Sequence, residues 1–144
     1  MYAVIERPGL RDFPEIFPLL KQLWPDKEFS KEKLTDVFDK GLYNPHQAYL
    51  VAKYEGKIVG FASLVIKDSL WDEGKLGHIN ELVVDRFHRN KGIGKDLLEE
   101  IIKVAKEKSC KRVELDSAFR RKEAHLFYKS QGFEMCNFLF SKKI

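Results

Sequence analysis

The sequence predicts an α+β domain in which helices flank one mixed, mostly antiparallel twisted sheet. Short β-branched runs alternate with amphipathic helical patterns along the chain. A strand from Lys75 to Val84 is followed by a long helical pattern and by a further strand, Lys111 to Asp116, as in a parallel crossover. With 144 residues, the chain has the size of one domain, and we expect residues 1–144 to form it.

The first third of the chain predicts one strand and two helices. Tyr2 to Glu6 alternates as a strand does. Apolar residues between Arg11 and Trp24 keep helical spacing, although an interior Pro18 is expected to kink or split that helix. Ser30 is a suitable N-cap for a second helix, Lys31 to Leu42.

Two strands, Gln47 to Tyr54 and Lys57 to Ile66, are then expected to form a hairpin, followed by a loop from Lys67 to Gly74. Near the C-terminus, Lys122 to Gln131 predicts a short helix that stops at Gly132. The last strands are expected at Phe133 to Met135 and Asn137 to Ser141.

The turn between the strand ending at Val84 and the long helix is the most informative stretch. Gly92 and Gly94 let a ligand approach the backbone and leave the first N–H groups of the helix uncovered. Full positive charges surround this turn, on Arg86, Arg89, Lys91 and Lys95. The turn is therefore a candidate phosphate cradle. The alternative is a glycine-opened helix start with a solvated basic turn.

Composition and charge exclude several classes of protein. No apolar run approaches the ~18 residues that a membrane span needs, and no signal peptide precedes the first strand, so we expect a cytoplasmic protein without a membrane partner. The net charge of +4 comes from a mixed surface without a long basic run, so no nucleic-acid partner is expected. Cys110 and Cys136 are expected to be buried free thiols, and no residue spacing indicates a metal site.

Two motifs carry a resemblance to a known family. Arg89-Asn90-Lys91-Gly92-Ile93-Gly94 resembles the Arg/Gln-x-x-Gly-x-Gly/Ala signature of the GNAT superfamily of N-acetyltransferases. The segment from Ala124 to Phe133 resembles the Ala-x-x-Phe-Tyr-x-x-x-Gly-Phe segment of the same family. The expected element order matches the GNAT fold over essentially the whole chain. Among relatives, the pattern looks most like aminoalkylphosphonate N-acetyltransferases and aminoglycoside 6′-N-acetyltransferases.

The resemblance implies that acetyl-CoA is the co-substrate and that no metal is needed. The backbone of Leu82, Val83 and Val84 is expected to pair with the pantetheine arm. Ser117 stands where many relatives carry a CoA-binding asparagine, so its role is open. The residues expected to hold the pyrophosphate are Arg89, Asn90, Lys91, Gly92, Ile93, Gly94 and Lys95.

The resemblance also implies direct transfer to an amine, with Tyr128 as the general acid for the departing sulfur. The alternative is that Tyr128 only packs beside Phe127 and Phe133. Glu81 is the candidate general base, directly or through a water. Strand alternation is expected to place it on the same face as Ile79 and Val83. The alternative for Glu81 is a salt bridge at a strand edge.

The expected acceptor is a primary amine on a small polar molecule. Trp24 to Phe38, the loop from Asp68 to Glu73 and the C-terminal strands are expected to surround it, although the charged loop is more typical of solvated surface. Two other functions stay open: a protein or peptide N-acetyltransferase, and a non-catalytic acyl-CoA-binding regulatory module. Relatives often dimerise, but no stretch of this sequence specifies a homodimer interface.

Overall fold

The structure is a computed structural model that describes residues 3–144. The chain divides into two compact units, of which the larger ends at Glu114 and the smaller is Leu115–Ile144. Each unit is described by itself below. The prediction of a single domain over residues 1–144 stays a prediction.

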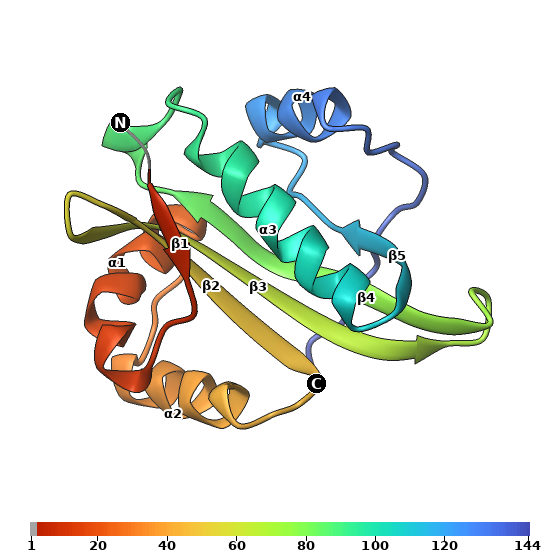
Figure 1. The fold of residues 1–144 in the computed structure, drawn as a ribbon, viewed down its shortest axis with the longest axis horizontal. Coiled ribbons are helices and arrows are strands. Elements are labelled where there is room, and N and C mark those ends of the chain that lie inside the picture. Colours follow the sequence, from red (N-terminus) through yellow and green to blue (C-terminus); the bar gives the residue numbers. More distant parts are fainter. Residues whose placement is uncertain (1–2) are drawn as a thin grey trace. The chain divides into compact units, whose positions relative to one another are not determined.

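The described residues form a five-stranded mixed sheet in the order β1-β2-β3-β4-β5 (Figure 1). The pairs β1–β2, β2–β3 and β3–β4 are antiparallel, and β5 lies beside β4 after the predicted crossover helix. The strands are β1 (Val4–Glu6), β2 (Gln47–Tyr54), β3 (Lys57–Ser69), β4 (Gly74–Val84) and β5 (Cys110–Leu115). The predicted α+β class is therefore confirmed.

Helices of the larger unit cover the two faces of this sheet (Figure 1). The helices α1 (Phe13–Leu23) and α2 (Lys31–Leu42) pack on one face, and α3 (Ile93–Glu107) packs on the other. Short 3₁₀ turns, η1 (Leu10–Asp12) and η2 (Arg86–His88), precede α1 and follow β4, and the smaller unit contains α4 (Lys122–Ser130).

The two sides of the sheet hold different parts of the core. On the side of α1 and α2, the rings of Phe13 and Phe38 meet at 4.8 Å, and Phe61 packs beneath them. On the side of α3, glycine allows close packing: a Cβ on Gly60 would meet the side chain of Leu97 at 3.3 Å. The first layer holds α1 and α2 against the sheet, and the second holds α3.

A β-bulge in β4 changes which side chains face each helix layer. Ser63 pairs with Glu81 and Leu64 pairs with Ile79, so Asn80 has no partner in the register. Paired residues of antiparallel strands share a face, and neighbours along a strand face opposite ways. Glu81 therefore shares the α1/α2 face with Val83, as predicted. Its predicted placement on the face of Ile79 is wrong, because the extra residue reverses the alternation.

Most predicted elements are found with shifted ends. The strand expected at Tyr2 to Glu6 is observed as β1, and Tyr2 lies outside the described residues. Pro18 lies inside α1 without ending it. Ser30 caps α2 by accepting a hydrogen bond from the Lys33 N–H at 3.2 Å. The loop expected from Lys67 is shorter, because β3 continues to Ser69.

Two predictions for the C-terminal segment are wrong. Phe133 to Met135 and Asn137 to Ser141 are not strands, although their residues favour that conformation. A strand is stabilised by a partner that pairs with its backbone, and local composition does not supply one.

The predicted burial of the two cysteines is also wrong. Both thiols are free, but Cys136 is exposed and Cys110 is only half-buried.

Candidate active site

Polar side chains form a row across three strands on the α1/α2 face. Tyr49 pairs with Ser63, and Ser63 pairs with Glu81, so the three residues lie side by side on β2, β3 and β4. Beyond them, Gln47 and His78 both pair with Val65 on the same face. All of these residues except Ser63 are half-buried. The row therefore offers polar groups that a small molecule can reach.

Ser63 binds Glu81 in two ways. Its hydroxyl donates to Oε1 of the Glu81 carboxylate and accepts a hydrogen bond from the Glu81 backbone N–H at 3.1 Å. Ser63 is 2% exposed and is the one buried polar residue within residues 3–144. A buried hydroxyl is costly unless it is hydrogen-bonded, and both of these bonds go to the same residue. The position of the carboxylate is thereby fixed relative to β3.

Tyr49 lies between the end of α2 and Glu81. Its ring stacks on Phe38 at 4.6 Å, and its hydroxyl lies so close to Gly41 that a Cβ there would collide with it. Burial raises the pKa of the Tyr49 phenol, and the negative charge of Glu81 raises it further. The phenol is therefore neutral at physiological pH and able to donate a hydrogen bond.

The backbone of Leu82, Val83 and Val84 follows Glu81 on β4. Leu82 and Val83 are buried, and the three residues pair with Ala62, Phe61 and Gly60 of β3. The side chains of this segment thus anchor it in both apolar layers. Its pairing with a pantetheine arm stays a prediction.

Asp85 orders the start of the turn after β4. Its Oδ1 accepts a hydrogen bond from Gln22 Nε2 at 2.8 Å, and its Oδ2 lies 2.7 Å from His88 Nδ1. The Gln22 Oε1 in turn accepts from the Arg86 N–H at 3.0 Å. Burial raises the pKa of Asp85, but the bonds from Gln22, His88 and the Phe87 N–H outweigh it and lower the pKa overall. The turn is therefore tied to α1 by an ionised carboxylate.

The rest of the turn is open and positively charged. Asn90 and Gly92 have φ angles of 62° and 82°, and a Cβ on Gly92 would meet no atom within 4 Å. Arg89 Nε donates to the Val84 carbonyl at 3.0 Å, and Lys91 Nζ lies 5.5 Å from the centroid of the Tyr54 ring. No side chain of residues 3–144 caps the N-terminus of α3. This arrangement suits an anion such as a pyrophosphate.

The side chains predicted to hold the pyrophosphate differ in solvent exposure. Arg89, Asn90, Lys91 and Lys95 are exposed, whereas Ile93 is only 3% exposed. The Ile93 side chain belongs to the α3 core layer, so only its backbone N–H is suited to meet a ligand.

Replacing Gly92 with alanine is expected to lower the free energy of unfolding by about 1 kcal/mol, because an alanine is strained at this positive φ. Urea unfolding measures the change. Gly9→Ala is the control, because Gly9 has a φ of −110° and also has no atom within 4 Å of a Cβ. Equal losses in the two variants would contradict the prediction.

The smaller unit contains the other two predicted site residues. Tyr128 is 8% exposed, and its ring lies 5.5 Å from Phe127 and 5.9 Å from Phe133. Burial raises its pKa, although Arg121 acts in the opposite direction. The phenol is therefore neutral and able to donate a proton. The Ser117 hydroxyl is buried without a hydrogen-bond partner among residues 3–144, which suits a contact with a bound ligand.

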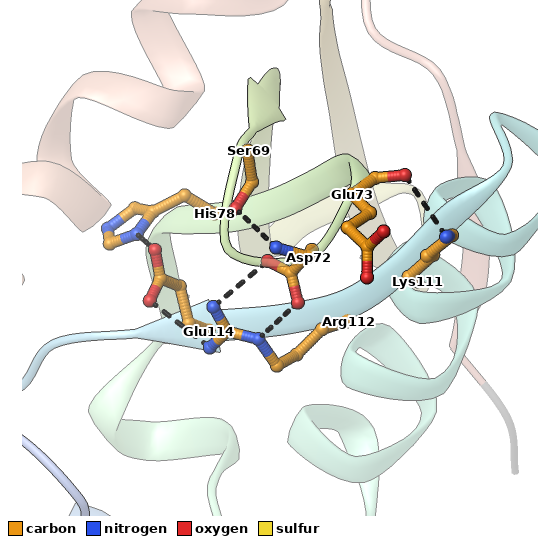
Figure 2. A network of polar contacts seen from close by, with 7 residues as sticks. All are labelled: Ser69, Asp72, Glu73, His78, Lys111, Arg112 and Glu114. Atoms are coloured by element: carbon orange, nitrogen blue, oxygen red, sulfur yellow. Dashed lines mark hydrogen bonds and ion pairs between the residues drawn. The ribbon is translucent and has the colours of Figure 1, made fainter.

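The charged loop from Asp68 to Glu73, predicted to lie beside the acceptor, is bonded to β5. Asp72 accepts two hydrogen bonds from Arg112 of β5, at 3.0 and 3.1 Å. Arg112 also contacts Glu114, which lies 3.5 Å from His78 (Figure 2). Arg112 lowers the pKa of Asp72 and neutralises its charge. Seven residue-to-residue steps along β4 separate Gly74 from Glu81, so this tip lies about 20 Å along the strand from Glu81.

Two kinds of feature are absent from residues 3–144. No helix among residues 3–144 is long and apolar enough to cross a membrane. Within the same residues, no three His, Cys, Asp or Glu side chains gather as metal ligands would.

The comparison with protein families decides the assignment. The model of the acetyltransferase (GNAT) family matches residues 13–133, which include the basic turn, the polar row and Tyr128. The chain belongs to the GNAT family. It is thus an acetyl-CoA-dependent N-acetyltransferase, as the two sequence motifs predicted.

Relatives of this GNAT enzyme act on different amines. Aminoalkylphosphonate N-acetyltransferase of Salmonella typhimurium is 29% identical over 133 residues, covering 92% of this chain and 86% of that protein. Glucosamine 6-phosphate N-acetyltransferase of Candida albicans is 32% identical over 118 residues, covering 80% and 77%. An aminoglycoside acetyltransferase from an uncultured soil metagenomic sample, solved with sisomicin, is 26% identical with a TM-score of 0.79, covering 99% and 97%.

Sequence reasoning missed two residues of the site. Ser63 lies in an apolar run and Tyr49 in a β-prone one, and each residue type is common in strands. A signal existed for Ser63, because it is a lone hydroxyl in the run from Ile58 to Ile66. Its partner is set by the register between β3 and β4, which the sequence does not show.

Proposed function

We propose that this GNAT enzyme transfers the acetyl group of acetyl-CoA to a primary amine of a small polar molecule, by direct attack in a ternary complex. The observation that carries the proposal is the Tyr49–Ser63–Glu81 row. It places a carboxylate on a half-buried polar face, beside the β4 segment that leads into the basic turn. Substrate ammonium groups are attracted to such a carboxylate and must lose a proton before they react.

Each predicted site residue in the larger unit has a proposed task. Bound acetyl-CoA supplies the thioester carbon that the amine attacks. Glu81 accepts the proton that the ammonium loses, which leaves the nitrogen lone pair available. The Leu82–Val84 backbone aligns the pantetheine arm, and an N–H of this segment faces the thioester oxygen. The exposed cations and open N–H groups from Arg89 to Lys95 bind the pyrophosphate.

The smaller unit is proposed to contribute a proton and a contact. Tyr128 gives its phenolic proton to the departing sulfur, which a buried neutral phenol is suited to do. The Ser117 hydroxyl, unpartnered among residues 3–144, binds CoA in place of the asparagine of other family members. Neither task requires a covalent enzyme intermediate.

The residues around Glu81 indicate the chemical class of the acceptor. Tyr49, Gln47 and His78 present hydrogen-bonding groups on the same face, as a small polar amine requires. The relatives named above acetylate an aminoalkylphosphonate, an amino-sugar phosphate and, by name, aminoglycosides. The alternative acceptor is an amine of a protein or peptide. The expected cytoplasmic location and the homodimer stay predictions.

The first experiment measures free-thiol release from acetyl-CoA with a panel of amines, for the wild type and Tyr128→Phe. We expect turnover with one class of small amine and a loss of about 100-fold in kcat when the phenolic proton is removed. Tyr43→Phe is the matched control, because Tyr43 is 84% exposed.

The outcomes separate the two acceptor classes and test the co-substrate. Release with peptides alone would favour a protein acetyltransferase. Binding of CoA without thiol release from any amine or peptide would contradict the assignment as an enzyme, and no CoA binding would contradict the cofactor assignment. Equal rates for the two tyrosine variants would remove Tyr128 from the mechanism.

A further inference from the structure

The bulge at Asn80 decides on which face of the sheet Glu81 lies. Without the extra residue, the register set by Leu64 and Ile79 would continue, and Glu81 would pair with Ala62. Ala62 shares the α3 face with Leu64 and Gly60, against which Leu97 packs. A carboxylate there would be buried in an apolar layer. With the bulge, Glu81 instead joins the half-buried polar row of the opposite face.

Ser63 is the residue opposite the point where the register changes. A bulge disrupts the ladder locally, and here the Glu81 N–H donates to the Ser63 side chain. The same hydroxyl turns its own proton toward Glu81 Oε1. One buried side chain thus holds both the backbone and the carboxylate of the residue that the bulge has turned over.

We infer that Ser63 is a positioning residue, which acts through Glu81 by holding its carboxylate on the acceptor face. The inference rests on the proposed role of Glu81 as the proton acceptor. A hydrogen bond to a carboxylate favours its ionised form, so Ser63 keeps Glu81 ready to attract an ammonium group and to take its proton. Ser63 itself touches neither substrate.

Three other titratable groups lie on this part of the face. Tyr49 of β2 stays neutral while a carboxylate titrates, because its pKa is raised. His78 of β4 and Glu114 of β5 lie 3.5 Å apart. A control for their charges is therefore needed when the charge on Glu81 is measured. Gly41, at the adjacent end of α2, carries no charge.

The kinetic test compares the wild type, Ser63→Ala, Ser63→Thr, Glu81→Gln and the Ser63→Ala/Glu81→Gln double variant. We expect Ser63→Ala to lower kcat about tenfold, with an unchanged KM for acetyl-CoA. Ser63→Thr keeps the hydroxyl and is expected to restore most of the rate. In the Glu81→Gln background, Ser63→Ala is expected to cause no further loss, because the hydroxyl acts through the carboxylate.

The outcomes distinguish this inference from the proposed function. If Glu81→Gln is slow but Ser63→Ala adds its full loss, Ser63 only supports the fold and the inference fails while the role of Glu81 stands. If Glu81→Gln retains the wild-type rate, the proposed role of Glu81 fails, and the positioning role fails with it.

A second readout does not depend on turnover. Carbon-13 NMR of labelled glutamate side chains follows the titration of Glu81, whose signal is assigned by its loss in Glu81→Gln. Ser63→Ala is expected to raise the apparent pKa of Glu81 by about one pH unit. The same comparison in a His78→Gln background removes the imidazole that lies on this face beside Glu114. An unchanged Glu81 titration in both backgrounds would overturn the inference.

Discussion

Glu81→Gln is expected to lower kcat by about 1,000-fold, because an amide cannot accept the proton that the acceptor ammonium must lose. Glutamine keeps the size of the side chain and an oxygen that accepts from the Ser63 hydroxyl. The fold and the polar row are therefore expected to persist. Steady-state thiol release across a pH series measures the loss, with the best amine from the panel.

The matched control is Glu99→Gln, which removes one negative charge from an exposed position on α3. Its rate is expected to equal that of the wild type. A Glu81→Gln rate within about threefold of this control would contradict general-base catalysis by Glu81. Solvent would then have to deprotonate the amine, and the polar row would serve binding alone.

Phe61→Ala is expected to lower the free energy of unfolding by about 3–5 kcal/mol, because it leaves a cavity in the α1/α2 layer. Phe61 is 2% exposed and its ring centroid lies 5.7 Å from that of Tyr49 and 6.4 Å from that of Phe38. The lost ring therefore also removes packing beneath the polar row. Urea-induced unfolding of purified protein gives the change in free energy.

Phe119→Ala is the control for the removal of a phenylalanine side chain, because Phe119 is 83% exposed. Its unfolding free energy is expected to stay within about 0.5 kcal/mol of the wild type. A loss below about 1 kcal/mol for Phe61→Ala would show that α1 and α2 do not depend on this contact.

The parts that were predicted from the sequence rest on local patterns. The helical spacing after Gly92 predicted α3, and the strand-turn-helix order placed the basic turn correctly at the end of β4. The Ser30 cap was likewise readable, because a cap involves residues three apart in the chain. Family resemblance then supplied the co-substrate, which the residue patterns alone left as a general anion.

The parts that were missed depend on contacts between distant residues. The bulge at Asn80 has no local sequence signature. It nevertheless places Ile79 and Glu81 on opposite faces of the sheet, where regular alternation would place them on the same face. The bond between Ser63 and Glu81 spans 18 positions, and that between Asp72 and Arg112 spans 40. The apolar residues after Phe133 showed a preference for strands but not the partner that a strand needs.

The charged strand β5 has a consequence for how the protein behaves at high concentration. In the described sheet the outermost strands are β1, which has three residues, and β5. An outermost strand offers free backbone groups on which another chain can stack and begin to aggregate. On β5, Lys111, Arg112 and Glu114 interrupt the apolar residues with charges of both signs, which disfavour such stacking. The ion pairs that tie the hairpin tip to β5 thus also help to keep the molecules dispersed.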